Sequence, residues 1–176
     1  MVTEPRSAGQ VAPGALEQVR ALLNSWLIPN DTRVATDRFD DLARSRDWTA
    51  TEAAVARSVR DDLRDVVEGG PQECGRLNAW IGRLDVRPVL ADGALTYRHD
   101  AGPAGDFLVT VLEAVSAGTW TRLKACPDCR WVFYDNTRNA SKRWCLMQAA
   151  GPNGRGCGDI AKVRRFRERH AGVASG

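Results

Sequence analysis

Residues 126–135 read CPDCRWVFYD, and this short stretch decides how the C-terminal part of the chain folds. Two cysteines separated by two residues can turn their sulfur atoms toward one point. The run from Trp131 to Tyr134 that follows is rich in the aromatic and β-branched residues typical of strands. Two further cysteines lie downstream, Cys145 after fifteen residues and Cys157 after another eleven. The pattern predicts a cysteine-bearing turn that leads into a short β-hairpin.

The cysteines of this region indicate a metal site. Four thiolates satisfy the tetrahedral coordination of Zn²⁺ and leave no position open for water, so we expect one structural zinc ion. A redox Cys-x-x-Cys pair normally begins a helix, whereas here a strand follows. An iron–sulfur cluster also takes four cysteines and stays an alternative, and His170 is a further candidate ligand. The predicted zinc ligands are Cys126, Cys129, Cys145 and Cys157.

The charge of the chain is divided unevenly along its 176 residues. The net charge is +3, but residues 1–119 carry 13 basic and 18 acidic side chains, whereas residues 120–176 carry 12 basic and 4 acidic ones. The first part therefore has a charge of −5 and the second part a charge of +8. A C-terminal part this basic favours a polyanionic partner such as nucleic acid.

Two cationic stretches accompany the cysteines. Residues 136–144 read NTRNASKRW, and residues 158–170 read GDIAKVRRFRERH. The second stretch predicts a helix in which Ile160, Val163 and Phe166 form a buried stripe while the cations lie on other sides. The side chains expected to contact DNA are Arg138, Lys142, Arg143, Arg164, Arg165 and Arg167. The alternative is that the basic helix pairs with acidic residues of the N-terminal part, namely Asp40, Asp41, Asp61, Asp62 and Asp65.

The first 119 residues are predicted to be mostly helical. Apolar residues recur at helical spacing, and the pattern predicts helices over 13–28, 50–68, 72–84 and 103–117, with a weaker amphipathic segment over 36–45. Thr49 and Glu52 form the sequence pattern of a capping box before the second of these helices. Asp92-Gly93 lies between two apolar runs and predicts a β-hairpin over residues 88–97. Cys74 is expected to be a small buried apolar residue.

These elements predict a mainly α fold in two domains. A multihelical domain with one small β-hairpin spans residues 13–119, and a treble-clef or ribbon-like zinc finger with a short hairpin and a basic helix spans residues 120–171. The sequence has no run of 18 apolar residues and no apolar stretch at its start, which favours a cytoplasmic protein. It has two histidines, no His-Glu-x-x-His, no Gly-x-Ser-x-Gly and no glycine-rich phosphate loop, so we do not expect an enzyme.

The C-terminal stretch resembles the CGNR zinc-finger family, in which the finger follows an N-terminal ABATE domain. The matching residues are CPDCRWVFYDNTRNASKRWCLMQ over 126–148 and CGDIAKVRRFRERH over 157–170. Upstream, residues 23–26 (LNSW) are similar to the segment that opens ABATE domains. The chain departs from the family's motif in having Asp159-Ile160 after Cys-Gly instead of Asn-Arg, and in the glycine-rich insert 149–156 between the last two cysteines.

The resemblance implies a stress-induced transcription regulator that binds zinc and DNA. In this hypothesis the basic finger contacts DNA, and the helical domain senses a small-molecule effector or forms a homodimer. The alternative hypothesis is a protein-interaction module in which structural zinc serves only to fold the C-terminal domain. The two hypotheses differ in one expectation. The cations of the finger are needed to bind DNA, but they are not needed if the finger only binds another protein.

Overall fold

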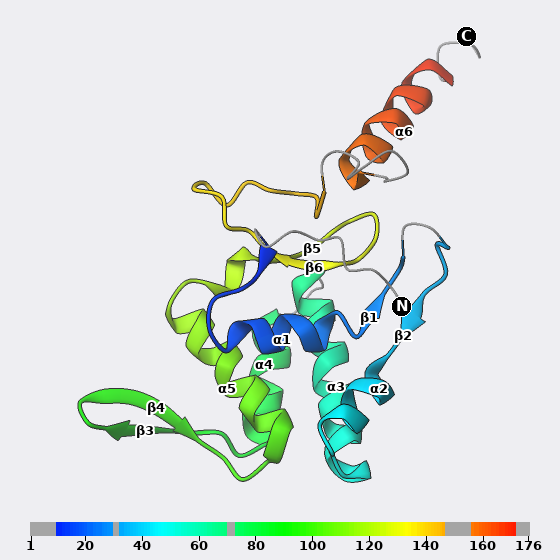
Figure 1. The fold of residues 1–176 in the computed structure, drawn as a ribbon. Helices are drawn as coiled ribbons and strands as arrows, with labels where there is room; N and C mark the ends of the chain where they lie inside the picture. The colour runs from blue at the N-terminus through cyan, green and yellow to red at the C-terminus, as the bar shows by residue number, and fades with distance from the viewer. Residues whose placement is uncertain (1–9, 30–31, 70–72, 147–155, 172–176) are drawn as a thin grey trace.

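The computed structural model describes residues 10–29, 32–69, 73–146 and 156–171. Within these residues the chain forms six α-helices and three two-stranded antiparallel sheets. The predicted mainly α fold is therefore confirmed. Figure 1 shows a bundle of helices at one end of the molecule and the C-terminal elements at the other. The bundle consists of α1 (Leu16–Leu23), α3 (Ala50–Val67), α4 (Glu73–Arg83) and α5 (Gly102–Ser116).

Helix α3 is the best predicted element, because its start is marked by local chemistry. The Thr49 hydroxyl accepts a hydrogen bond from the Glu52 N–H at 3.3 Å, and the Glu52 carboxylate accepts one from the Thr49 N–H at 2.8 Å. The predicted capping box is thus confirmed. The helix buries Ala56, Val59, Leu63 and Val66. It also buries Arg60 and Arg64, which the apolar pattern did not predict.

The first predicted helix is too long at its C-terminal end. Helix α1 ends at Leu23, and Trp26–Leu27 form strand β1, which pairs with β2 (Thr36–Asp37). Helix α2 (Phe39–Ser45) follows, so the amphipathic segment over 36–45 begins as a strand. Helical spacing alone cannot exclude so short a strand, and here Leu27 is buried against the cysteine cluster instead of continuing the helix.

The β-hairpin of the helical part has the predicted turn. Strands β3 (Arg87–Ala91) and β4 (Ala94–Arg98) are joined by Asp92 and Gly93, which have φ values of 51° and 76°. Positive φ at both central residues is the signature of the type I′ turn that Asp-Gly favours. The hairpin projects from the bundle beside the start of α5 (Figure 1).

Cys74 is exposed, so the prediction that it is buried is wrong. Helix α4 packs on the core through Leu77 and Trp80, and Leu84, directly after the helix, is buried with them. The Trp80 indole N–H donates to the Asp62 carboxylate of α3 at 2.8 Å and thereby fixes which side of α4 faces inward. Cys74 lies in the first turn of the helix, outside this packed face.

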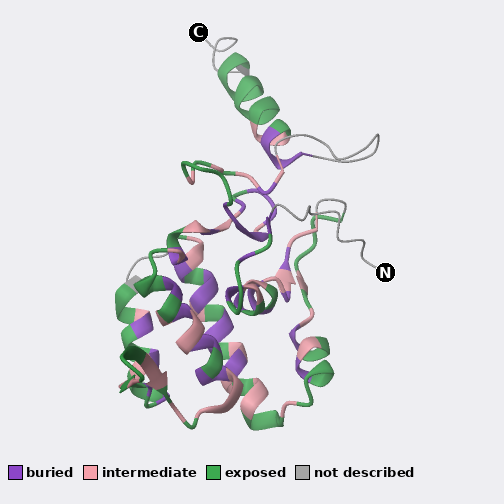
Figure 2. Cartoon of the chain, turned by 60° about the vertical axis from the view of Figure 1, so that its left-hand side comes forward, coloured by how far each residue is buried: buried purple, intermediate pink, exposed green. Residues whose placement is uncertain are grey.

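One apolar core extends from the helical bundle into the C-terminal region. Strands β5 (Leu123–Ala125) and β6 (Val132–Tyr134) follow a 3-10 turn over Trp120–Arg122. Leu123, Val132 and Tyr134 belong to the same buried cluster as the bundle. The buried residues run from the bundle to the cysteines, whereas the last helix, α6 (Cys157–Ala171), is mostly exposed (Figure 2). No helix among the described residues has the length and apolarity to cross a membrane.

Candidate metal centre and nucleic-acid interface

Four cysteines from separate elements meet at the junction between the hairpin and α6. Cys126 follows β5, Cys129 lies in the turn before β6, Cys145 lies in the following loop, and Cys157 is the first residue of α6. Their sulfur atoms all lie within 4.8 Å of one another, and all four residues are fully buried. The structure therefore brings together the whole set of predicted ligands.

The turn between β5 and β6 aims the first two sulfurs at this centre. The register pairs Ala125 with Val132, and the Cys126 N–H donates to the Trp131 carbonyl at 2.8 Å. The Arg130 N–H donates back to the Cys126 carbonyl at 2.9 Å, and Arg130 adopts a φ of 58°. Because the chain reverses direction within these residues, both cysteines of the Cys-x-x-Cys pair face the same point.

The donor set fits a closed zinc site. The sulfurs lie close together, at 3.4 Å for Cys129 and Cys145 and at 3.6 Å for Cys145 and Cys157. Hydrogen bonds from Cys129 and its neighbours lower the pKa of the Cys126 thiol, whereas sharing protons with Cys126 raises the pKa of Cys145. A dication bound between the four sulfurs would favour the thiolate form of every cysteine. The four cysteines can bind one zinc ion, which leaves no position open for catalysis.

Comparison with protein families agrees with this geometry. Residues 122–170 match the family model of the CGNR zinc finger. This part of the chain is therefore similar to the CGNR zinc finger. The match includes all four cysteines and both cationic stretches. No curated protein matches the chain. Cys157 completes the cluster although the motif is altered at Asp159-Ile160, and residues 149–155 of the glycine-rich insert lie outside the described residues.

The C-terminal finger is docked on the helical bundle by polar side chains that are buried or half-buried. The Asn24 amide donates to the Val132 carbonyl and accepts from the Val132 N–H, both at 2.8 Å, and so acts as a strand partner for β6. Arg64 of α3 donates to the carbonyls of Trp26 and Arg130, each at 3.0 Å. The Gln10 amide donates to the Cys145 carbonyl at 2.5 Å. Sequence patterns did not identify these contacts, since each joins residues that lie far apart in the chain.

Asp135 holds the first cationic stretch in place. Its side chain is fully buried, and it accepts hydrogen bonds from Lys124 Nζ at 2.8 Å, from the Thr137 N–H at 3.0 Å and from the Lys142 N–H at 2.7 Å. Burial alone would raise the pKa of this carboxyl, but these donors lower it well below its usual value. Arg122 donates to the carbonyls of Asp135 and Thr137 at 2.9 and 2.8 Å. These hydrogen bonds therefore hold the loop in a defined conformation.

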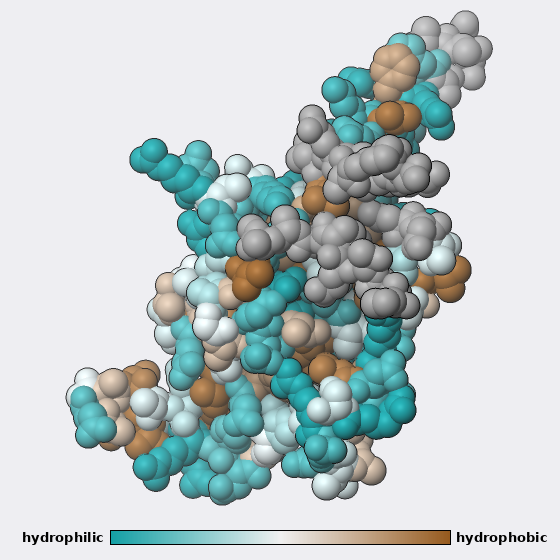
Figure 3. Space-filling model, viewed as in Figure 1, coloured by the Kyte–Doolittle hydropathy of each residue, from teal (hydrophilic) through white to brown (hydrophobic). Residues whose placement is uncertain are grey.

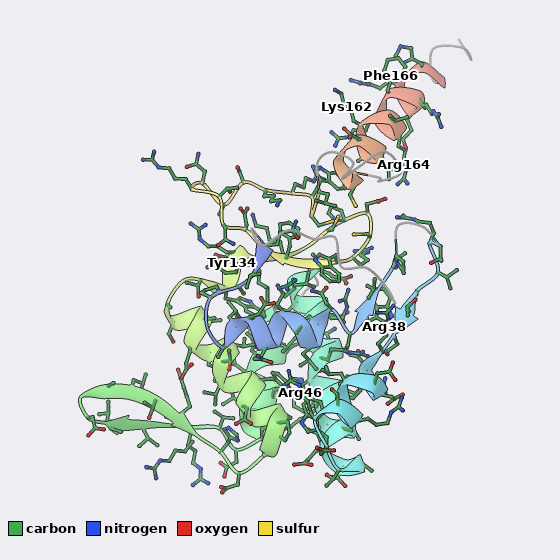
Figure 4. All side chains as sticks on the ribbon, viewed as in Figure 1. Arg38, Arg46, Tyr134, Lys162, Arg164 and Phe166 are labelled. Atoms are coloured by element: carbon green, nitrogen blue, oxygen red, sulfur yellow. The ribbon has the colours of Figure 1, made fainter. Side chains whose placement is uncertain are left out.

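The predicted DNA contacts fall into two groups. In the loop, Arg138 and Arg143 are exposed, and Lys142 is half-buried with its Nζ 5.5 Å from the Phe133 ring centre. On α6, Arg164 approaches the Asp128 carboxylate of the metal-binding turn at 3.8 Å. Figure 4 shows Lys162 and Arg164 on this helix beyond the cysteine region. Among the described residues, no ion pair is formed by Arg138, Lys142, Arg143, Lys162, Arg165, Arg167 or Arg169.

The apolar stripe of α6 is not buried as the sequence predicted. Val163 is 49% and Phe166 55% exposed, and Ile160 is half-buried. The helix projects away from the bundle, so no other described element covers these residues (Figure 1). Phe166 instead stacks on His170 with ring centres 3.9 Å apart. His170 is exposed and lies outside the cysteine cluster, so it is not the substitute ligand considered from the sequence.

The five aspartates of the bundle that could neutralise α6 have other partners among the described residues. Asp40, Asp41 and Asp61 pair with Arg57, Arg44 and Arg60. Asp62 and Asp65 both pair with Arg76 of α4. The alternative in which these five aspartates pair with the basic helix is therefore wrong, because the arginines of the bundle are their partners.

Proposed function

We propose that the chain binds DNA through its CGNR finger and regulates transcription, without acting as an enzyme. The observation that carries this proposal is the position of α6. It begins at one of the four cysteines, projects into solvent, and carries cations of which only Arg164 has an acidic partner among the described residues. A cationic helix fixed at one end to a rigid centre can enter a groove or follow a phosphate backbone.

The spacing of the cations on α6 supports this function. Lys162, Arg165 and Arg169 are separated by three and four residues, so they lie along one side of the helix. The apolar residues Val163 and Phe166 lie on another side. Arg138 and Arg143 lie on the loop that Asp135 holds, and we expect them to contact phosphates flanking the helix.

Binding to a labelled DNA duplex over a salt series tests this function. For the zinc-loaded chain, the logarithm of the association constant should fall linearly with the logarithm of salt concentration. Replacing Lys162, Arg165 and Arg169 with alanine should weaken binding and reduce the slope by about 0.9 for each lost phosphate contact. The matched control removes the same charge from exposed arginines of the helical part, Arg44, Arg83 and Arg87. No binding at low salt, or equal effects of the two triple variants, would contradict the proposal.

A second candidate function is a protein-interaction module, and the exposed apolar stripe of α6 favours it. Soluble proteins rarely leave an amphipathic helix face uncovered without a partner. Replacing Val163 and Phe166 with serine separates the two functions. If DNA is the ligand, this variant keeps the salt-dependent binding, whereas the alanine variant of the three cations loses it. In either case the helical bundle is a further candidate for sensing an effector or for dimerisation.

A further inference from the structure

The hairpin of β3 and β4 exposes apolar side chains far from the zinc finger. Leu90 and Leu95 face each other across the hairpin and are 79% and 57% exposed. Tyr97 is the residue of the hairpin that packs against the main core, at its base. Figure 3 shows the hairpin as a lobe at the lower left with hydrophobic residues at its surface. An isolated two-stranded hairpin is marginally stable in water, and no other strand among the described residues pairs with this one.

The turn determines which backbone groups of the hairpin point outward. In a two-residue hairpin the closing pair, here Ala91 and Ala94, exchanges its backbone hydrogen bonds, and the pairs then alternate along the strands. The outward-pointing groups of β4 therefore belong to Leu95 and Tyr97. The structure pairs β4 with β3 alone among the described residues, so this outer edge is open.

The two edges of the hairpin are not equivalent. The outward-pointing positions of β3 are Leu90 and Pro88, and proline has no N–H to donate. A proline at such a position protects an edge strand from pairing with another strand. On β4 both outward positions keep their N–H groups. The β4 edge, formed by Leu95 and Tyr97, thus has every N–H and C=O group that an added strand needs. A further strand can therefore pair fully with β4, whereas Pro88 interrupts such pairing on β3.

We propose that the β4 edges of two copies of this chain pair antiparallel about a two-fold axis at Thr96. Leu95 then exchanges backbone hydrogen bonds with Tyr97 of the second copy, and Tyr97 with Leu95 of the second copy. The two hairpins become one sheet in the order β3-β4-β4-β3. This joins the open edges in a closed, symmetric interface that leaves no unpaired strand at its centre.

The side chains of β4 are complementary to themselves in this register. Leu95 comes opposite Tyr97, an aliphatic–aromatic pair, and Thr96 comes opposite its own copy. The Thr96 hydroxyl keeps its hydrogen bond to the Val89 carbonyl of its own hairpin, at 3.2 Å. Arg98 comes opposite Ala94. Within the hairpin Arg98 already faces Arg87, so a register that opposed two Arg98 side chains would add like charge. Each side chain of the β4 edge thus lies opposite a compatible side chain of a second copy. For this reason we assign a second copy of this chain as the partner of the edge.

Site-directed cross-linking tests the axis directly in the full zinc-loaded chain. With Cys74→Ser as background, Thr96→Cys places two thiols opposite each other at a non-hydrogen-bonded pair, where the backbones approach most closely. Mild oxidation should yield a covalent dimer. Val89→Cys is the matched control, because it lies on the same face of β3 and its two copies would be about 14 Å apart, three strand spacings. Equal cross-linking of both variants, or none of Thr96→Cys, would overturn the proposal.

Edge-blocking variants give an independent measurement. Leu95→Pro and Leu90→Pro each remove one exposed leucine and one outward N–H, from β4 and β3 respectively, without removing a bond within the hairpin. Sedimentation of the wild-type chain should show a concentration-dependent dimer, which Leu95→Pro shifts to monomer and Leu90→Pro retains. A monomeric wild type, or dimer loss in both variants, would contradict the interface. Neither readout involves DNA, so failure here leaves the function of the finger unaffected.

Discussion

At the scale of single residues, Asp135 is the side chain that determines the shape of the finger. Both of its carboxylate oxygens act only as acceptors: one binds the Thr137 hydroxyl and N–H, and the other binds Lys124 Nζ and the Lys142 N–H. Lys124 in turn donates to the Lys142 carbonyl at 3.2 Å. One buried carboxylate, paired with the half-buried Lys124, therefore organises the strand β5 and the loop that carries Arg138 and Arg143.

Replacing Asp135 with asparagine should destabilise the chain by about 3 kcal/mol, the usual cost of removing one partner of a buried ion pair. The amide would turn a donor toward groups that are themselves donors. Urea unfolding of the zinc-loaded protein measures this. Asp41→Asn is the matched control, because its ion pair with Arg44 lies at the surface and should contribute less than about 1 kcal/mol. Equal effects of the two substitutions would contradict the role of Asp135.

The same carboxyl predicts a pH dependence. Lys124, Thr137 and Lys142 lower the pKa of Asp135 in the folded protein below the value of about 3.9 expected in the unfolded chain. Its stabilising effect is thus complete above that unfolded value and is lost as the pH falls through the folded one. The difference in unfolding free energy between wild type and Asp135→Asn should shrink below about pH 4. A difference that stays constant down to pH 2 would show that the carboxylate is not the stabilising form.

The sequence indicated the importance of residues near Asp135 but not the reason. The step from Tyr134 to Asp135 is part of the stretch that resembles the CGNR family, and the four cysteines could be predicted from their spacing alone. The partner Lys124 lies on the opposite strand, and the Thr137 and Lys142 N–H groups carry no side-chain signal. Tertiary hydrogen bonds to the backbone leave no periodic pattern in a sequence, so this network was not predictable.

At the scale of elements, the docking of β6 onto α1 decides how the finger and the bundle are joined. Asn24 ends α1 and supplies the hydrogen bonds that a neighbouring strand would give to Val132. The Ile28 N–H extends this junction by donating to the Cys129 carbonyl at 3.2 Å. These hydrogen bonds therefore fix the metal-binding turn relative to the end of α1.

Asn24→Ala should weaken this junction. Val132 is fully buried, so the substitution leaves its N–H without a partner at a cost of about 2 kcal/mol. Amide hydrogen exchange at Val132 should accelerate, and the midpoint of chemical unfolding should fall. Asn139→Ala, in the exposed part of the loop, should leave both measurements unchanged. If exchange at Val132 stayed slow in Asn24→Ala, β6 would be held by its strand pairing alone.

Elements were predictable where local chemistry marks them. The capping box of α3 and the Asp-Gly turn are formed by residues a few positions apart, and both were predicted correctly. The stripe of α6 has the same helical spacing as a buried face, yet it is exposed, because spacing reports that a helix is amphipathic and not that a partner covers it. The strand at Trp26–Leu27 was missed for a related reason, since its pairing with Thr36–Asp37 is a tertiary choice.

At the scale of the whole molecule, the zinc finger and the helical bundle share one core. Leu123, Val132 and Tyr134 pack with residues of α1, α3 and α5, whereas the cysteines form a second cluster with Leu27, Trp131 and Phe133. The sequence placed a boundary at residue 119 because charge and composition change there. The distribution of charge along a sequence does not show which apolar residues are buried together, so the sequence could not predict this joint core.

Removal of zinc should therefore affect more than the finger. Chelation leaves four buried thiols in mutual contact and loosens the turn on which Val132 and Tyr134 depend. We expect a lower thermal midpoint for the whole chain together with faster proteolysis in residues 120–171, and restoration of both on adding Zn²⁺. Mg²⁺, which prefers oxygen ligands, serves as the control ion and should restore neither. A chelated chain that melts at the same temperature as the zinc-loaded chain would show that the two parts are independent.

Zinc X-ray absorption spectroscopy of the reduced chain tests directly whether the four cysteines hold one zinc ion at the start of α6. The structure predicts about one equivalent of zinc with four sulfur neighbours at about 2.3 Å and no nitrogen. Cys157→Ser should lose one sulfur neighbour, whereas Cys74→Ser should leave the spectrum unchanged. A nitrogen ligand in the wild type, iron in place of zinc, or an unaltered spectrum for Cys157→Ser would contradict this account.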